Sequence, residues 1–384
     1  MRHIPPILLL TLFAVQLGYS DYLEVRRKAT VKEEPRSDAA IIEHVEEGTF
    51  LELLNNGAQD TGYYKVKASS TSQDGWIYRS LVRRHEGEIP GTTLVLGDKV
   101  FSIPLEDLDR WSDHILTTFE DATITGLSSV HNLESDCEMH FGARIPEYQG
   151  DPEGVVLEPM NICLEKFFGK AVYKKSDWAG FGASLVNQSV TVEGVPRIWP
   201  EHLHGAESAS NPNHALELHP LTKIVHNNNE FDFSSFVYVP EDYKGGLQRE
   251  SAERIVEKTV VHVKKKGDDA EIFFDSGQIG NFSILDVRFD KDDIRTISGG
   301  HRIKGQVVLA SLEARGVSMV TVMGSPIDSL VARLKSGDEE LIRFEALVLF
   351  SLDPDALHDA VSASNGNPVK VNLPIQLIVY GTVQ

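Results

Sequence analysis

The sequence predicts a mostly β, multidomain protein in which two small barrels precede a β-rich α+β domain. Short runs of β-branched and aromatic residues recur along the chain and are separated by Gly, Pro and Asn turns. The length of 384 residues is enough for two or three domains. A composition of 41% hydrophobic and 24% charged residues is that of ordinary globular protein.

Residues 1–20 have the pattern of a secretory signal peptide. A short basic start, Met1-Arg2-His3, is followed by a mostly apolar run over 4–17 and then by Gly18-Tyr19-Ser20, which has small residues at 18 and 20. The run is too short to span a bilayer, which takes about 20 apolar residues. The alternative is a buried N-terminal helix, which Pro5-Pro6 disfavours. We therefore expect an exported protein, periplasmic or secreted, whose mature chain starts near Asp21.

Net charge, apolar stretches and cysteine content bear on nucleic-acid binding, membrane crossing and disulfide formation. The net charge of −20 repels phosphate backbones, so we expect no nucleic-acid partner. No stretch after the signal peptide is long and apolar enough to cross a membrane. The two cysteines, Cys137 and Cys163, could form a disulfide in an oxidising compartment, and the alternative is a pair of free, buried thiols.

Residues 21–86 are predicted to form a small barrel of short strands. Strand-like runs at 23–31, 41–45, 50–54 and 62–66 are separated by turn residues, and a fifth run with Gly75-Trp76-Ile77 ends the segment. Five short strands in so few residues cannot build a large sandwich, and they suit a small barrel.

The same segment, over about 23–84, resembles the bacterial SH3 domain. The residues that carry the resemblance are Ala29-Thr30-Val31, Pro35, Gly48, Gly62-Tyr63-Tyr64-Lys65-Val66 and Gly75-Trp76-Ile77. The resemblance implies recognition of a cell-wall peptide or glycan, or a spacer role beside another module. Tyr63, Trp76 and Tyr78 are the candidate contacts, and the alternative is that these aromatic side chains complete a small core.

Residues 115–226 are predicted to form a second barrel, after a linker with a short helix at 87–114. The helix is expected around Leu105, Leu108 and Trp111. Five strands with one helix between the third and the fourth is the element order of an OB fold. The strands are expected at 122–127, 137–145, 154–159, 189–199 and 215–224, and the helix at 163–173.

This second segment, over about 115–225, resembles a group of uncharacterised bacterial OB-like domains. The group carries a strand that ends in Glu-apolar-His-Pro, an earlier acidic-x-His strand and a Glu-Pro pair. Here these are Glu217-Leu218-His219-Pro220, Glu138-Met139-His140 and Glu158-Pro159. The resemblance implies a fold and no particular reaction.

The same residues are candidate metal ligands. The period of two in a strand places Glu138 with His140 on one face, and Glu217 with His219 on one face. If the two faces converge and Glu158 joins them, the set could hold a divalent ion such as Zn²⁺ or Mn²⁺, and a bound water could become a nucleophile. The alternative is a hydrogen-bonded polar strip or an exposed barrel face. The sequence carries no HExxH motif.

Residues 245–384 are predicted to form a β-rich domain with a helix over 355–363, which Pro354 would open. The repeated small-barrel style suggests a second β domain related to the one before it, but the Glu-x-His motif does not recur there, so the sequence does not support an internal duplication. A His-rich loop at 201–213 is expected to be a surface loop or a lid.

The sequence therefore favours an exported binding protein that recognises a cell-wall peptide or glycan and needs no cofactor. The first alternative is a metal-assisted hydrolase that uses the Glu and His residues of the second barrel. The second alternative is a scaffold without a ligand. The motifs of α/β-hydrolases, P-loop proteins and dinucleotide-binding proteins are absent from the sequence.

Overall fold

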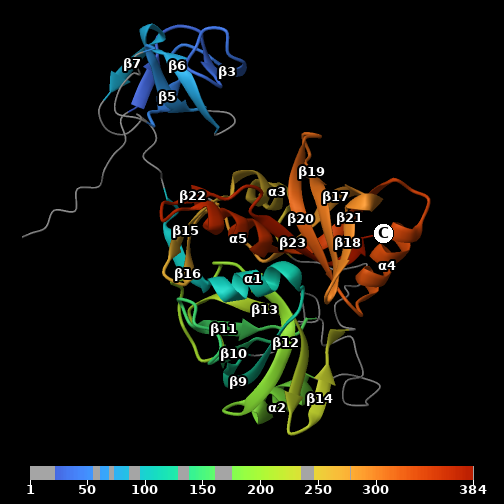
Figure 1. Ribbon diagram of the computed structural model, residues 1–384. Helices are drawn as coiled ribbons and strands as arrows, with labels where there is room; N and C mark the ends of the chain where they lie inside the picture. Colours follow the sequence, from blue (N-terminus) through green and yellow to red (C-terminus); the bar gives the residue numbers. More distant parts are fainter. Residues whose placement is uncertain are drawn as a thin grey trace, which may run out of the picture. The chain divides into compact units, whose positions relative to one another are not determined.

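The computed structural model describes residues 22–54, 61–68, 73–85, 96–128, 138–160, 175–234, 246–276 and 278–383, without the side chains of Lys175 and Val383. The chain is mostly β and divides into two compact units, Met1–Val95 and Leu96–Gln384, which confirms the predicted fold class (Figure 1). The expected signal peptide, Cys137 and Cys163 lie outside the described residues.

The first unit contains two small antiparallel sheets, β4-β1-β7 and β3-β2-β6-β5, around a core of its own. Leu23, Val31 and Ile77 are fully buried in that core. Gly75 lets β6 lie close to β2, because a Cβ atom there would lie 2.4 Å from Val31 Cγ1. The elements are β1 Tyr22–Val25, β2 Ala29–Lys32, β3 Ile41–Val45, β4 Phe50–Glu52, β5 Tyr63–Lys67, β6 Asp74–Tyr78, η1 Arg79–Leu81 and β7 Val82–His85.

The second unit contains a closed five-stranded barrel in the order β9-β10-β11-β13-β12. The third and fifth strands, β11 and β13, pair in parallel, and the other pairs are antiparallel. A helix, α2, lies between the third and fourth strands in the chain. The helix expected over 163–173 lies wholly outside the described residues. The elements are β9 Thr117–Leu127, β10 Phe141–Arg144, β11 Gly154–Leu157, α2 Lys175–Leu185, β12 Ser189–Ile198, β13 His214–His226 and β14 Asn229–Asp232.

A second closed barrel in the same unit has the same connectivity, in the order β17-β19-β20-β23-β21. Its third and fifth strands also pair in parallel, and a helix, α4, again separates the third and fourth strands. The second β domain is therefore related to the first in topology, although the Glu-x-His motif does not recur in it. The elements are β17 Phe282–Asp290, η4 Lys291–Asp293, β18 Ile294–Ile297, β19 Gly300–Val308, β20 Ala314–Val322, α4 Pro326–Ser336, β21 Leu341–Leu352 and β23 Ile375–Val383.

A third sheet, β22-β15-β16-β8, lies beside the barrels and is joined by helices α1 and α5 (Figure 1). The predicted helix around Leu108 and Trp111 is α1, and Pro354 occupies the first turn of α5 as expected. Residues 96–114 thus contribute a strand and a helix to the second unit. The elements are β8 Lys99–Pro104, α1 Leu105–Asp113, α3 Arg249–Lys258, β15 Val260–Lys266, β16 Asp269–Asp275, α5 Pro354–Ala363 and β22 Val369–Lys370.

The two barrels meet through their fourth strands, β12 and β21. Arg197 Nε donates to the Phe350 carbonyl oxygen at 2.8 Å, and the Ile198 amide donates to Ser351 Oγ at 3.1 Å. Trp199 stacks on Phe350 with ring centroids 6.0 Å apart. A shared apolar cluster, which includes Val195 from the first barrel and Leu349 from the second, continues the contact.

Candidate metal centre

The second unit contains both closed barrels, and we call β9-β10-β11-β13-β12 the first barrel and β17-β19-β20-β23-β21 the second barrel. The outer face of the first barrel carries the predicted polar cluster. On β13, Leu216 and Leu218 belong to the main apolar core, so the intervening Glu217 and the following His219 point to the opposite face. Beyond the end of β11, the Glu158 amide donates to the Leu218 carbonyl at 3.0 Å, and the Glu158 carbonyl accepts from the Leu221 amide at 2.9 Å. These bonds extend the parallel pairing and place Glu158 beside β13.

Glu138 and His140 approach the cluster from the segment just before β10. The sequence predicted them within a strand, but the strand begins at Phe141. The His140 backbone is nevertheless fixed, because its amide donates to Ser128 Oγ at 2.9 Å and its carbonyl accepts from the Ser128 amide at 2.9 Å. Three separate chain segments thus supply the carboxylates and imidazoles.

Four of the five predicted ligands converge around one point. They are Glu138, His140, Glu158 and His219, and we call them the Glu/His cluster. His140 Nε2 lies 3.4 Å from Glu138 Oε1 and 3.4 Å from Glu158 Oε1. His219 Nε2 lies 3.5 Å from Glu138 Oε2, and His219 Nδ1 lies 2.7 Å from Glu158 Oε2. Donor atoms of Glu138, Glu158 and His219 all fall within 4.8 Å of one another, which is the spacing of a group that can hold one ion.

The cluster is buried. Glu138 and Glu158 are each 2% exposed, and His219 is fully buried. The His140 side chain, at 16%, is the most exposed of the four. Buried carboxylates are tolerated only beside cations or hydrogen-bond donors, so the cluster demands positive charge.

Glu217 is the predicted ligand that the structure does not place in this group of donors. Its carboxylate forms a buried ion pair with Arg197 and lies 3.1 Å from His214 Nε2. Glu217 Oε2 also lies 3.3 Å from His219 Nδ1, so the carboxylate orients the imidazole. A carboxylate behind a histidine in this way fixes the ring and raises its basicity.

Sequence reasoning missed Arg197 and did not assign His214 to the site. Arg197 is 1% exposed and interrupts the apolar end of β12, a pattern that marks a charge with a buried partner. His214 is fully buried at the start of β13, and its Nδ1 atom lies 2.7 Å from the Pro212 carbonyl oxygen. That carbonyl accepts a hydrogen bond from Nδ1–H, so the ring can donate from Nε2 to Glu217 only when it is protonated on both nitrogens.

Proton affinities in the cluster reflect its negative charge. Burial acts to lower the pKa of His140, but the Glu158 and Glu138 carboxylates outweigh it and raise this pKa to about 9. The pKa of His219 is raised well above its usual value because Glu158, Glu138 and Glu217 outweigh the effect of burial. Burial would raise the pKa of Glu217, but Arg197 and His214 hold it well below its usual range. Without a metal ion, protonated imidazoles therefore supply the positive charge.

The His-rich loop lies next to this site. His202 stacks on His214 with ring centroids 5.2 Å apart, and Glu201 Oε2 lies 3.5 Å from Arg197 Nη2. Burial raises the pKa of Glu201 despite the opposing Arg197 charge. His204, by contrast, is exposed. Among the described residues, the loop therefore contacts Arg197 and His214, which are the partners of Glu217.

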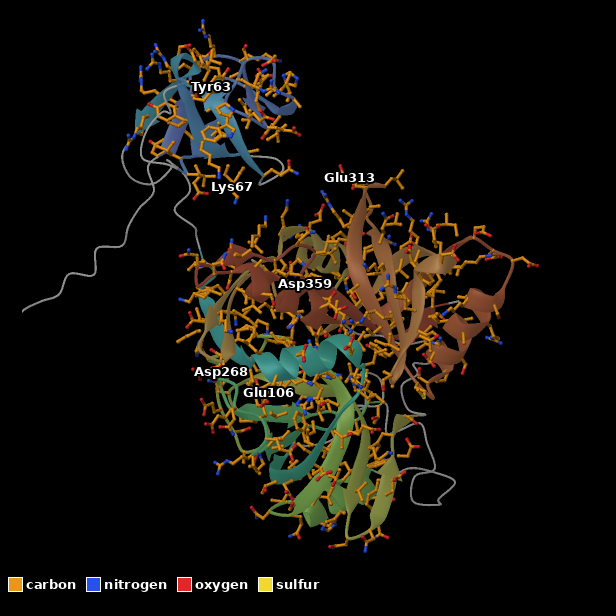
Figure 2. The ribbon with its side chains drawn as sticks, viewed as in Figure 1. Tyr63, Lys67, Glu106, Asp268, Glu313 and Asp359 are labelled. Atoms are coloured by element: carbon orange, nitrogen blue, oxygen red, sulfur yellow. The ribbon has the colours of Figure 1, made fainter. Side chains whose placement is uncertain are left out.

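The aromatic residues of the first unit occupy a different kind of site. Tyr63, which Figure 2 labels in the first unit, is buried. Tyr78 is 39% exposed, and the two ring centroids lie 5.1 Å apart. Both line a pocket of about 630 Å³. Trp76 is half-buried, lies opposite Lys32 and Lys65 in the sheet, and does not line this pocket. The other lining residues are Thr30, Lys32, Pro35, Arg36, Ser37, Thr61 and Leu81.

Comparison of the chain with protein families, curated proteins and solved structures finds no match. Membership in the two families that the sequence resembles therefore stays a prediction. Among the described residues, no helix has the length and apolar character that crossing a bilayer requires.

Proposed function

We propose that the protein binds one divalent transition-metal ion through Glu138, Glu158 and His219, with His140 as a fourth ligand. The observation that carries the proposal is the spacing of the donor atoms. An ion with bonds of about 2.0–2.1 Å in tetrahedral geometry separates its ligand atoms by about 3.3 Å. The contacts of His140 Nε2 with both carboxylates, at 3.4 Å, are close to this value.

Charge supports the same proposal. Three buried carboxylates, Glu138, Glu158 and Glu217, lie close together, and Arg197 forms its ion pair with Glu217. A divalent ion would add positive charge beside Glu138 and Glu158, and the imidazole protons would then leave, because a metal binds the neutral ring. Arg197 would keep its ion pair with Glu217. The Glu217 carboxylate contacts the His219 imidazole and would hold in place the ring that binds the ion.

The donor set also indicates which ions fit and what they would do. Imidazole with carboxylate oxygen suits Zn²⁺, Mn²⁺ and related ions better than Ca²⁺ or Cu⁺. Such an ion lowers the pKa of a bound water and polarises a carbonyl or phosphoryl oxygen, which is the chemistry of a metal-assisted hydrolase. The partly exposed side of His140 is where a substrate would enter. Export, expected from residues 1–20, would place this activity outside the cytoplasm.

Chelation and hydrolysis assays test the proposal together. We expect the metal-loaded chain to lose several degrees of Tm on treatment with EDTA, because an ion that binds only the folded state stabilises it. We expect it to cleave p-nitrophenyl acetate or bis(p-nitrophenyl) phosphate, and the Glu158→Gln variant to lose that activity. An unchanged Tm on chelation contradicts the metal site. A metal-dependent Tm without cleavage of either ester contradicts only the hydrolase.

A second candidate function is recognition of a cell-wall peptide or glycan by the first unit. The pocket beside Tyr63 and Tyr78 favours it, because an exposed aromatic ring at a pocket rim offers a stacking surface. We expect the full chain to sediment with isolated cell walls and the Tyr78→Ala variant to remain in solution, with the exposed Ile41→Ala variant as the control. Failure of the unmodified chain to sediment would leave the first unit as a spacer, as in the scaffold alternative.

A further inference from the structure

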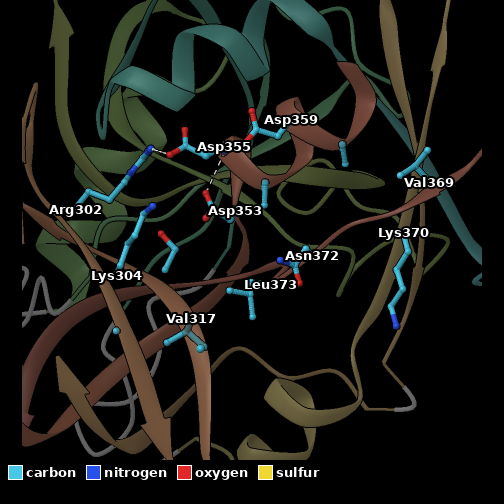
Figure 3. A pocket seen from close by; sticks show the side chains of 15 residues that line it. Arg302, Lys304, Val317, Asp353, Asp355, Asp359, Val369, Lys370, Asn372 and Leu373 are labelled. Carbon is cyan, nitrogen blue, oxygen red and sulfur yellow. Dashed lines mark hydrogen bonds and ion pairs between the residues drawn. The ribbon is translucent and has the colours of Figure 1, made fainter. Parts of the chain in front are cut away.

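A second pocket, remote from the Glu/His cluster in sequence, lies between the second barrel and helix α5 (Figure 3). Its volume of about 500 Å³ is in the range of sites for small ligands, about 300–1,000 Å³. Small residues make room for it: Ala356 and Ala360 face it from α5, and Gly305 and Gly316 face it from β19 and β20. Charged side chains surround this hollow.

Some of these charges have a structural role. Asp353 is the N-cap of α5, and its side chain accepts from the Asp355 amide at 3.1 Å. Asp355 forms an ion pair with Arg302, whose Nη2 atom also donates to the Trp111 carbonyl at 3.2 Å. These contacts fasten α5 and α1 to the second barrel, and they leave no net charge between Arg302 and Asp355.

The remaining charges are carried by exposed side chains. Lys304, Lys370 and Asp359 line the pocket, and none of them forms an ion pair with another residue in the described part of the chain. Figure 3 shows Lys304 and Lys370 on opposite sides of the pocket, with Asp353 and Asp359 above it.

The pocket lining includes an exposed apolar side chain. Leu373 is 53% exposed and has a φ of 49°, a left-handed backbone conformation that costs energy for a leucine. Figure 3 places Leu373 and Asn372 in the middle of the lining, where an apolar surface and an amide face the hollow together.

We propose that this pocket binds a short peptide with free termini. Its ammonium group would pair with Asp359 and Asp353, and its carboxylate with Lys304 on the other side. Leu373 and the alanines of α5 would contact its side chains. Charge complementarity favours this ligand, because an anion or a cation alone would leave the charges of the opposite sign in the pocket without a partner. The burial that raises the pKa of Asp353 to about 6 is consistent with a carboxyl group that lacks a full counter-charge.

Three related tripeptides test the proposal on the full chain by isothermal titration calorimetry. The probes are trialanine, N-acetyl-trialanine without the ammonium group, and trialanine amide without the carboxylate. Maltotriose serves as a neutral polyol of similar size. We expect trialanine to bind and each capped form to bind at least about tenfold more weakly.

Two variants test which end of the peptide Asp359 and Lys304 each bind. Asp359→Asn should weaken trialanine about tenfold and leave the affinity of N-acetyl-trialanine unchanged, because that probe lacks the ammonium group. Lys304→Gln should weaken trialanine and leave trialanine amide unchanged. The exposed Lys258→Gln variant, away from the pocket, is the control.

No saturable binding of trialanine up to about 10 mM, a tenfold excess over a millimolar Kd, would overturn the proposal. Equal binding of the three peptides, or preferential binding of maltotriose, would overturn it as well. These measurements do not involve the Glu/His cluster, so their outcome is independent of the metal site.

Discussion

Arg197 in the first barrel donates a hydrogen bond of 2.8 Å from Nε to the backbone carbonyl of Phe350 in the second barrel. The same guanidinium forms an ion pair with Glu217, whose carboxylate faces His219. One buried side chain therefore connects the contact between the barrels with the residues behind the Glu/His cluster. Sites at such interfaces are common because both parts can contribute to positioning a ligand.

Replacing Arg197 should destabilise the second unit strongly. In Arg197→Met, the Glu217 carboxylate stays buried without its cation, which costs roughly 3–5 kcal/mol of unfolding free energy. Urea denaturation measures this cost. The Arg197→Met/Glu217→Gln double variant should recover part of it, whereas Arg144→Met, an exposed arginine of the same barrel, should change stability by less than about 0.5 kcal/mol. Equal effects at Arg197 and Arg144 would contradict the buried pair.

The first unit should unfold independently of the second. Ile77 is fully buried in a core made only of residues from the first unit. Ile77→Ala should therefore cost about 2–5 kcal/mol and lower only one of the transitions in a calorimetric scan. The exposed Ile41→Ala variant should leave both transitions in place. If both transitions shift with Ile77→Ala, the two units unfold as one.

Asp353 should make the stability of the second unit depend on pH. Burial, with the Asp355 charge as a smaller contribution, raises its pKa from 3.8 to about 6. Between these values the folded state binds more protons than the unfolded state, so the unfolding free energy rises as pH falls from about 7 to 4. The gain from this group is at most about 3 kcal/mol.

The Asp353→Asn variant isolates that contribution, because asparagine keeps the oxygen that caps α5 but cannot ionise. We expect the variant to be more stable than the parent at pH 7, and the difference to vanish near pH 4. Chemical denaturation at several pH values measures it. A difference that stays constant across this range would show that Asp353 titrates normally.

The sequence predicted much of the fold because its patterns are local. The alternation over 189–199 and 215–224 predicted β12 and β13, and Pro354 marked the start of α5. The repeat of one barrel topology could not be predicted, because it depends on strand order and on which strands close the barrel. The two barrels place different residues on their corresponding faces, a polar cluster with His219 in one and an apolar cluster with Ile378 in the other.

The candidate site was predicted in part for the same reason. The Glu-x-His spacing indicated that Glu217 and His219 share a face. The structure places Glu138, His140 and Glu158 around His219, and Glu217 contacts the same imidazole. The separation of Glu217 from the group of donors depends on Arg197, which a long-range contact brings to it. No spacing rule in the sequence links Arg197 on one strand to Glu217 on the next.

Elemental analysis of the purified chain tests the metal site most directly. We expect about one divalent ion per chain, because three donor groups fall within 4.8 Å of one another. The His219→Ala and Glu158→Gln variants should retain less than about a tenth of it, while His226→Ala, a histidine at the far end of β13, should retain all of it. A folded parent chain that holds no ion after incubation with Zn²⁺ or Mn²⁺, or a metal content that these two variants leave unchanged, would contradict the site.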